Sequence, residues 1–221
     1  MVSGIMKAGA AVNKLTGLVG GGTDGMCVCA GTKVFKANGE IINIEKLQKD
    51  DGIIGWNTHK TIPQLIHDFV EPRYKQCVEI VLKNGSSLRC SVDHPILNLT
   101  SNIWEFKRAD KLKIGDTVGL APNINYWGSV DNNNSYTIGY SLKDEFYNEK
   151  SIKDIRKFNK ISTCKFLAGL FDSSGSIDSE NSIILYRSNA NLLKEISLHL
   201  QKLGIFSIFK TLSKHKHILK I

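Results

Sequence analysis

The chain has 221 residues, enough for one large domain or two small ones, with 42% hydrophobic and 23% charged residues. This balance is typical of a globular protein with a sizeable core. No run of about eighteen apolar residues occurs, which excludes a membrane-spanning helix and a membrane partner. The first residues lack a signal-peptide pattern, so we expect a cytoplasmic protein.

The charge and the cysteines narrow the class of protein further. The net charge is +8, and residues 140–221 hold 14 Lys and Arg against 8 Asp and Glu. Such an excess favours phosphate backbones, although a solvated Lys-rich surface is an equally good interpretation. Five irregularly spaced cysteines argue against a disulfide framework and for free thiols in a reducing compartment. A zinc site that includes Cys27 and Cys29 is a weaker alternative, because no second close pair of Cys or His residues follows these two cysteines.

Residues 1–26 begin with a stretch that we interpret as a short helix from Ile5 to Val19. Three consecutive glycines then open a loop over residues 20–25. We expect this segment to lead into a domain without joining its core.

From Cys27 to about Leu120 the sequence predicts a β-rich domain. The β-branched and alternating segments are residues 32–35, 40–44, 52–56, 69–71, 77–82, 87–91 and 117–120. Three dipeptides, Asn38-Gly39, Asp51-Gly52 and Asn84-Gly85, are strong turn signals between them. Many short strands joined by such turns indicate an all-β domain that closes on itself.

The character changes after residue 120. Residues 121–160 are rich in Asn, Lys and Glu and read as loops with a loosely structured stretch. A short apolar helix over residues 165–172, a strand over 182–187, a helix over 189–203 and a strand over 205–211 follow. The second helix has an apolar stripe at positions 192, 193, 196, 200 and 203, and Gly204 stands where a helix-ending glycine is expected.

Two segments of the β-rich region carry the chemistry. Cys27 is followed by Gly31-Thr32, and Ser91-Val-Asp93-His94-Pro lies about sixty residues later. A cysteine thiolate can attack the carbonyl carbon of the peptide bond before it and form a thioester. The leaving nitrogen must be protonated as that bond breaks, which calls for a histidine placed by the fold.

These segments, together with residues 104–116, resemble the Hint domain of inteins over residues 27–120. The resemblance implies a mainly β, horseshoe-like Hint domain, with its N-terminal portion at residues 27–121 behind an N-extein-like leader at 1–26. It implies that Cys27, Ser91, Asp93 and His94 act on the Met26–Cys27 bond without a cofactor, Ser91 standing where the family usually has threonine. Cys29 is an alternative nucleophile, but its spacing to Gly31-Thr32 is two residues too short.

Residues 166–175, Phe-Leu-Ala-Gly-Leu-Phe-Asp-Ser-Ser-Gly, resemble the LAGLIDADG motif of homing endonucleases. The resemblance implies an α+β partial LAGLIDADG endonuclease domain at residues 161–221, with double-stranded DNA as partner. In that family, carboxylates at the ends of two packed helices hold a divalent metal, with Asp172 a candidate here. Ser174, however, occupies the usual acid position. We therefore expect DNA binding without cleavage, and Mg²⁺ only if the nuclease is active.

Residues 137–144 resemble a worn first copy of the same motif, with Asp144 in the acid position as a second candidate for metal binding. The copy lies only about thirty residues upstream, too close for a complete repeat. We accordingly interpret residues 122–160 as a linker or the remnant of a first endonuclease repeat.

The chain lacks the His-Asn pair, followed by Cys, Ser or Thr, with which inteins end. It is therefore expected to be an N-terminal intein portion that needs a C-terminal intein segment, in cis or in trans, for complete splicing. The alternative hypothesis is a LAGLIDADG homing endonuclease or DNA-binding protein with a passive Hint domain. Cleavage before Cys27 by an added thiol distinguishes the two.

Overall fold

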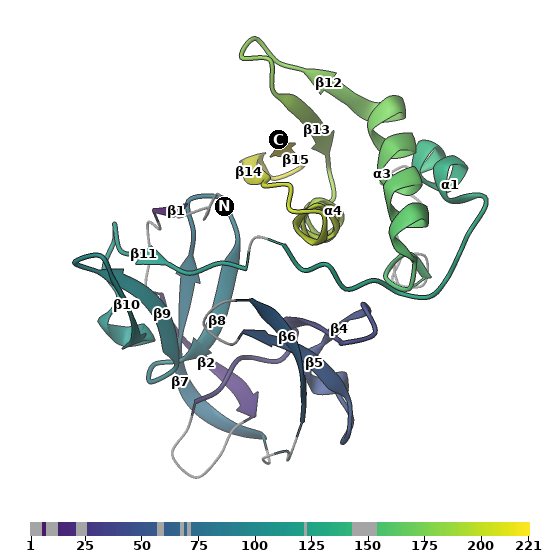
Figure 1. Cartoon of the computed structure of the whole chain (residues 1–221). Coiled ribbons are helices and arrows are strands. Elements are labelled where there is room, and N and C mark those ends of the chain that lie inside the picture. The colour runs from purple at the N-terminus through teal and green to yellow at the C-terminus, as the bar shows by residue number, and fades with distance from the viewer. Residues whose placement is uncertain are drawn as a thin grey trace. The chain divides into compact units, whose positions relative to one another are not determined.

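The computed structural model describes residues 6–7, 13–20, 26–56, 60–66, 69, 72–121, 123–142 and 154–221. It divides the chain into two compact units (Figure 1). The first unit comprises Met1–Phe35 and Ile42–Ala121, and the second comprises Lys36–Ile41 and Pro122–Ile221. In the described residues, no helix is both long and apolar enough to cross a membrane.

The first unit is built almost entirely from short antiparallel strands. Its elements are β1 (Met6–Lys7), β2 (Asn13–Gly20), β3 (Lys33–Phe35), β4 (Ile41–Asn43, whose first residue falls in the second unit), η1 (Ile44–Lys46), β5 (Gly52–Trp56), β6 (Thr61–Leu65), β7 (Pro72–Val81), β8 (Ser87–Ser91), β9 (Pro95–Thr100), β10 (Ile103–Arg108), η2 (Ala109–Lys111) and β11 (Thr117–Val118).

Strand β7 is the centre of a three-stranded sheet with the order β2-β7-β8. The segment after the unit's first cysteine joins β8 from the other side through a bridge between Val28 and Cys90. A second sheet has the order β1-β11-β9-β10, and β3-β4 and β5-β6 form two-stranded ribbons. A hydrophobic cluster of Val78, Ile80, Cys90, Ala109, Leu112 and Val118 lies between β7, β8 and η2.

The expected helix from Ile5 to Val19 is wrong. Residues Asn13–Gly20 form β2, which pairs with β7 in continuous register from Asn13↔Glu79 to Gly20↔Pro72. The local pattern allowed a helix, but a ladder of main-chain hydrogen bonds to a distant strand decides the conformation. The segment therefore joins a sheet of the first unit. The glycine-rich loop at residues 21–25 lies outside the described residues.

The β-rich prediction for residues 27–120 is confirmed, with several local differences. Two of the three turn dipeptides close hairpins: Gly39 and Gly85 both have a φ of 83°. The third dipeptide, Asp51-Gly52, does not close a hairpin, because Gly52 is already the first residue of β5. The positive φ at this turn, 71°, belongs to Asp50. Strands β6, β9 and β10 were not predicted. The predicted strand at 69–71 is absent at Phe69, and residues 70–71 lie outside the described part.

The second unit contains the described helices and one sheet. Its elements are α1 (Ser135–Ser141), α3 (Lys160–Ser174), β12 (Gly175–Ile177), β13 (Ile183–Arg187), α4 (Ala190–Lys202), β14 (Ile208–Ser213) and β15 (Lys216–Lys220). The prediction of helix, strand, helix and strand is confirmed. β12 and β15 were missed, and β14 begins three residues later than expected.

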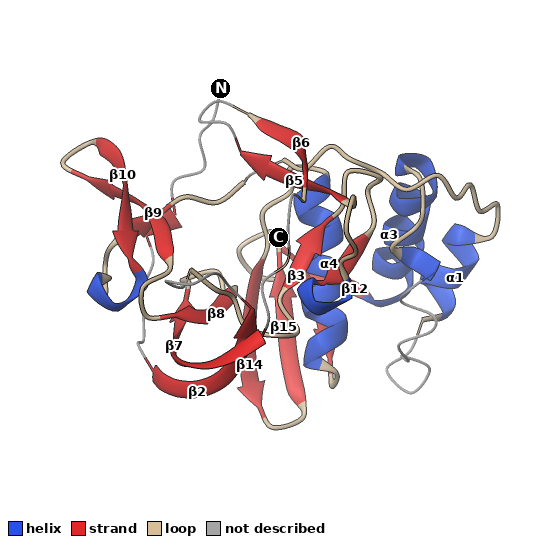
Figure 2. Ribbon diagram, turned by 90° about the horizontal axis from the view of Figure 1, so that it is seen from below, coloured by secondary structure: helices blue, strands red, loops and turns tan. Residues whose placement is uncertain are grey.

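The four-stranded sheet has the order β12-β13-β15-β14. Leu185 and Leu219 pair across β13 and β15, are fully buried, and contact apolar side chains of α3 and α4. The two long helices thus cover one face of the sheet, and α1 lies beside α3 (Figures 1 and 2). Asn189 caps α4 by accepting from the amides of Asn191 and Leu192.

A polar face of α4 is buried as well, which the apolar stripe did not predict. Arg156 donates two hydrogen bonds to Glu195, at 2.6 and 2.7 Å. Lys202, whose side chain lies over the Trp127 ring at 4.6 Å, donates to the Gly39 carbonyl at 2.8 Å. These partners allow charged groups to be buried in the core of the second unit.

Candidate functional sites

The Gly-Thr pair after the first cysteines forms a tight turn. Gly31 has a φ of 85°, a conformation that glycine adopts without strain. Its amide donates to the Glu45 carboxylate at 2.8 Å, and the Thr32 hydroxyl donates to the Cys29 carbonyl at 2.6 Å. The turn therefore lies directly after the bridged residues Val28 and Cys29, between Cys27 and β3.

Cys27 is held by Ser91 from both sides of its backbone. The Cys27 amide donates to the Ser91 hydroxyl at 3.1 Å, and the Ser91 amide donates to the Cys27 carbonyl at 2.8 Å. Cys27 is 2% exposed and Ser91 is fully buried, whereas Met26 is 67% exposed. The nitrogen of the Met26–Cys27 bond thus lies in the interior against a hydroxyl, while the residue before it reaches solvent.

Asp93 and His94 lie in the turn that follows Ser91. The Ser91 hydroxyl donates to Asp93 Oδ1 at 2.5 Å, and the His94 amide donates to the Ser91 carbonyl at 3.0 Å. His94 Nδ1 is buried and has no hydrogen-bond partner among the described residues. Burial lowers the pKa of His94 below 6.5, and the opposing effect of the Asp93 charge is smaller. The imidazole is therefore neutral at pH 7, with a ring nitrogen available to exchange a proton.

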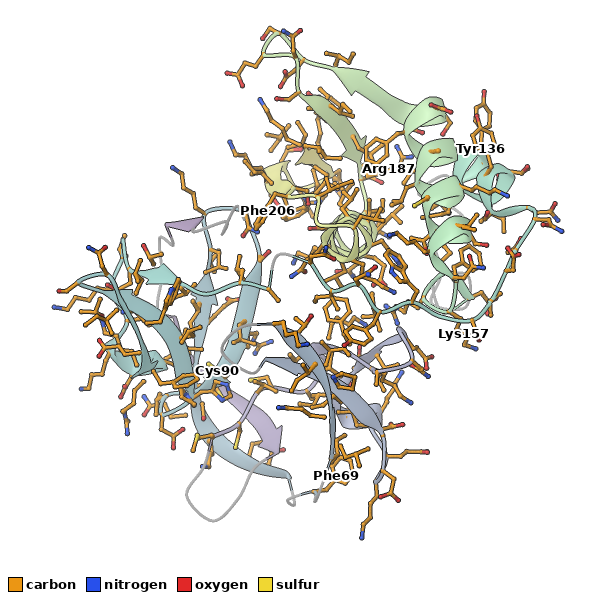
Figure 3. The ribbon with its side chains drawn as sticks, viewed as in Figure 1. Phe69, Cys90, Tyr136, Lys157, Arg187 and Phe206 are labelled. Atoms are coloured by element: carbon orange, nitrogen blue, oxygen red, sulfur yellow. The ribbon has the colours of Figure 1, made fainter. Side chains whose placement is uncertain are left out.

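Cys27 packs with Cys29 and Cys77 in one buried cluster, whereas Cys90, labelled in Figure 3, belongs to the hydrophobic cluster with Val78 and Ile80. The Cys29 thiol contacts the Cys77 sulfur at 3.6 Å, and both residues are buried and free. Burial, and then the hydrogen bond with Cys77, raises the pKa of Cys29 to about 11. The Cys29 thiol is therefore protonated at pH 7. The described residues contain no cluster of three metal-ligating side chains.

In the second unit, α1 and α3 cross at two glycines. A Cβ atom added to Gly139 would lie 1.9 Å from the Phe166 carbonyl oxygen, and one added to Gly169 would lie 2.1 Å from that of Tyr136. Each glycine thus faces the residue three positions before the other glycine. This reciprocal contact relates the two helices by an approximate twofold axis, and only glycine permits such a close approach.

The ends of these helices differ from a metal site. Asp172 is exposed, and one of its oxygens accepts a hydrogen bond from Tyr136 at 3.0 Å (Figure 3). At the usual acid position, the hydroxyls of Ser173 and Ser174 lie 3.0 Å apart. Asp144 lies outside the described residues. Mg²⁺ prefers carboxylate ligands, so the described end of α3 does not fit this ion.

The sheet face opposite α3 and α4 carries basic and aromatic side chains. Tyr186 and Lys210 both pair with Ile218, so these residues share a face of the sheet. Lys216 lies over the Tyr186 ring at 4.8 Å, and both lysines are exposed. Lys220 on the same face pairs with Asp178 at 2.7 Å, which neutralises part of the charge. The exposed positive charge thus lies at the β14–β15 end of this face.

Comparison with known proteins finds a match to a protein family within the second unit. Residues 163–219 match the family model described as LAGLIDADG-like domain. The match begins inside α3 and ends inside β15, so it spans the motif helix, the four-stranded sheet and α4. The chain therefore contains a LAGLIDADG-like domain, as the sequence motif predicted.

One curated relative matches a larger part of the chain. Transcription initiation factor IIB of Methanocaldococcus jannaschii is 27% identical over 121 residues, which is 53% of this chain and 17% of that protein. The chain thus spans less than a fifth of this relative.

Sequence reasoning named the residues that meet at Cys27 but missed the contacts around them. It assigned orientation of the scissile amide to Ser91, and the Cys27 N–Ser91 Oγ contact is present. The pairing of Cys29 with Cys77 was not predicted, because no local signal relates residues 48 positions apart.

Proposed function

We propose that the first unit is the N-terminal portion of an intein and that Cys27 carries out an N–S acyl shift at the Met26–Cys27 bond. The relevant bond is the one whose nitrogen donates to Ser91. The proposal extends to residues 1–26 as the N-extein-like leader and to a C-terminal intein segment as the partner that completes splicing.

The proposed step is an isomerisation and needs no cofactor. The Cys27 sulfur attacks the Met26 carbonyl carbon, and the thiol proton passes to neutral His94. The carbon–nitrogen bond then breaks, and His94 returns the proton to the departing nitrogen. A thioester and a free amino group replace an amide and a thiol, so atoms and charges balance.

The observation that carries this proposal is the hydrogen bond from the Cys27 amide to Ser91 at 3.1 Å. The Ser91 hydroxyl donates to Asp93, and the Ser91 carbonyl accepts from the His94 amide, so the turn that contacts this bond through Ser91 also carries a carboxylate and an imidazole. The match to 17% of a transcription initiation factor fits an element carried within a longer host, because most of that relative lies outside the match.

The test is cleavage by an added thiol. Purified chain incubated with dithiothreitol at pH 7 should release residues 1–26, detected by mass spectrometry under denaturing conditions. Cys27→Ala should abolish release, and Cys164→Ala, which changes an exposed cysteine of α3, should leave it unchanged. An intact wild-type chain after prolonged incubation with thiol would contradict the proposal.

The second candidate function is DNA binding by the LAGLIDADG-like domain, which the basic face at Lys210 and Lys216 favours. Lysine side chains beside an exposed tyrosine supply both charge and a stacking surface for nucleic acid. We propose binding without cleavage, because Ser174 replaces a carboxylate at the end of α3. Binding of duplex DNA that weakens with salt supports this candidate. Mg²⁺-dependent cutting by the wild-type chain would contradict the proposed loss of cleavage.

A further inference from the structure

Ser91 uses its hydroxyl in two directions. The oxygen accepts from the Cys27 amide at 3.1 Å, and the proton is donated to Asp93 Oδ1 at 2.5 Å. A hydroxyl has one proton and two lone pairs, so donation to Asp93 turns a lone pair toward the Cys27 amide. If the proton were not held there, the hydroxyl could rotate and present its proton to that amide instead.

Serine also lacks the restraint that threonine has at the same position. Threonine carries a methyl group on Cβ, which limits its χ1 angle, whereas serine can occupy three staggered positions. Ser91 is fully buried, so the direction of its hydroxyl depends on contacts within the interior. A second contact is therefore needed to hold the Ser91 oxygen against the Cys27 nitrogen.

We propose that Asp93 is the positioning residue that holds the Ser91 hydroxyl against the Met26–Cys27 amide, replacing the restraint of the missing methyl group. Two backbone hydrogen bonds also hold Cys27 and the turn at Ser91. The Ser91 amide holds the Cys27 carbonyl at 2.8 Å, and the His94 amide closes the turn on the Ser91 carbonyl at 3.0 Å. Cys27 is thus held at its amide and at its carbonyl, on either side of its Cα atom. The consequence for catalysis rests on the acyl shift proposed above.

Two measurements test the role of Asp93. The first is hydrogen exchange of the amide of residue 27, measured by NMR in the Cys27→Ala background, where no cleavage can occur. The second is the rate of thiol-induced release of residues 1–26 with Cys27 present. A hydrogen bond to a charged group contributes about 1.5–3 kcal/mol, so Asp93→Ala should change each rate about tenfold or more, raising exchange and slowing release.

The informative variant is Ser91→Thr combined with Asp93→Ala. The threonine methyl should restore slow exchange and most of the release rate without any carboxylate. Asp93→Asn, whose side-chain oxygen can still accept from Ser91, should give intermediate values. Asp116→Ala is the matched control, because this aspartate of the first unit also accepts a hydrogen bond from a side chain, that of Lys107. It should leave residue 27 unaffected.

Several outcomes would overturn the proposal. Unchanged exchange in Asp93→Ala would show that the carboxylate does not hold Ser91. If the double variant regained slow exchange at residue 27 but not the release rate, Asp93 would act in the reaction and not only as a positioning residue. Absence of release from the wild type would refute the acyl shift, whereas the exchange measurements would still decide whether Asp93 positions the hydroxyl.

Discussion

The two units differ in what their candidate sites contain. In the first, Ser91 contacts both the Cys27 amide and Asp93, and the His94 amide closes the same turn. In the second, the glycine crossing of α1 and α3 is complete, but serine hydroxyls stand where a metal needs carboxylates. A close helix crossing contributes to the stability of a unit, whereas a substitution at an exposed helix end usually has little effect on stability.

The largest effect should come from the imidazole of the first unit. His94→Ala should slow thiol-induced release of residues 1–26 by about 100-fold or more, the usual contribution of a general acid–base group. The rate is measured by mass spectrometry over time. His215→Ala, which changes an exposed histidine of the second unit, is the control. Equal release rates for the two variants would show that His94 takes no part in the reaction.

The helix crossing of the second unit should be almost as sensitive. Gly169→Val should destabilise this unit by about 3 kcal/mol, because its Cβ would overlap the Tyr136 carbonyl. Hydrogen exchange of peptides from α3 reports the loss. Ala168→Val is the matched control, since it adds the same side chain at the adjacent exposed position. If both variants exchange alike, the close crossing is not what stabilises the unit.

A pH dependence should separate the units as well. Burial lowers the pKa of His199 from 6.5 to about 4, with smaller effects from Glu195, Lys202 and Arg156. The folded second unit therefore binds this proton less readily than the unfolded chain. The contribution of neutral His199 to the free energy of unfolding is complete above pH 6.5. It is lost as the pH falls toward 4, by up to about 3 kcal/mol.

Exchange of α4 peptides between pH 4 and pH 6.5, corrected for the intrinsic rate, measures this loss. His199→Leu should flatten the dependence, and His215→Leu should not. A dependence that survives in His199→Leu would point to another titrating group.

The smallest effect is expected on the basic sheet face. Lys210→Ala and Lys216→Ala should each weaken duplex DNA binding a few-fold and reduce the salt dependence by about one counterion. Fluorescence anisotropy at several salt concentrations measures both quantities. Lys111→Ala, an exposed lysine of the first unit, should change neither. If it weakens binding equally, the attraction is not localised on this face.

Much of the second unit could be predicted because its signals are local. The cap at Asn189, the apolar stripe of α4 and the glycine that ends it act within a few residues, and the helix forms where they indicate. The glycine that closes the β7–β8 hairpin is equally local, with φ 83° at Gly85. By contrast, burial of Glu195 and His199 depends on Arg156, a residue from another element.

The sequence by itself predicted that Cys27, Ser91 and His94 share a site, from the spacing in which they stand. Only the tertiary structure decided how they meet: Ser91 contacts Cys27 across 64 positions. It likewise turned Asn13–Gly20 into a strand and brought Gly139 against Gly169. Turns and caps depend on neighbours along the chain, whereas strand pairing and close helix packing depend on groups that only the folded chain brings together.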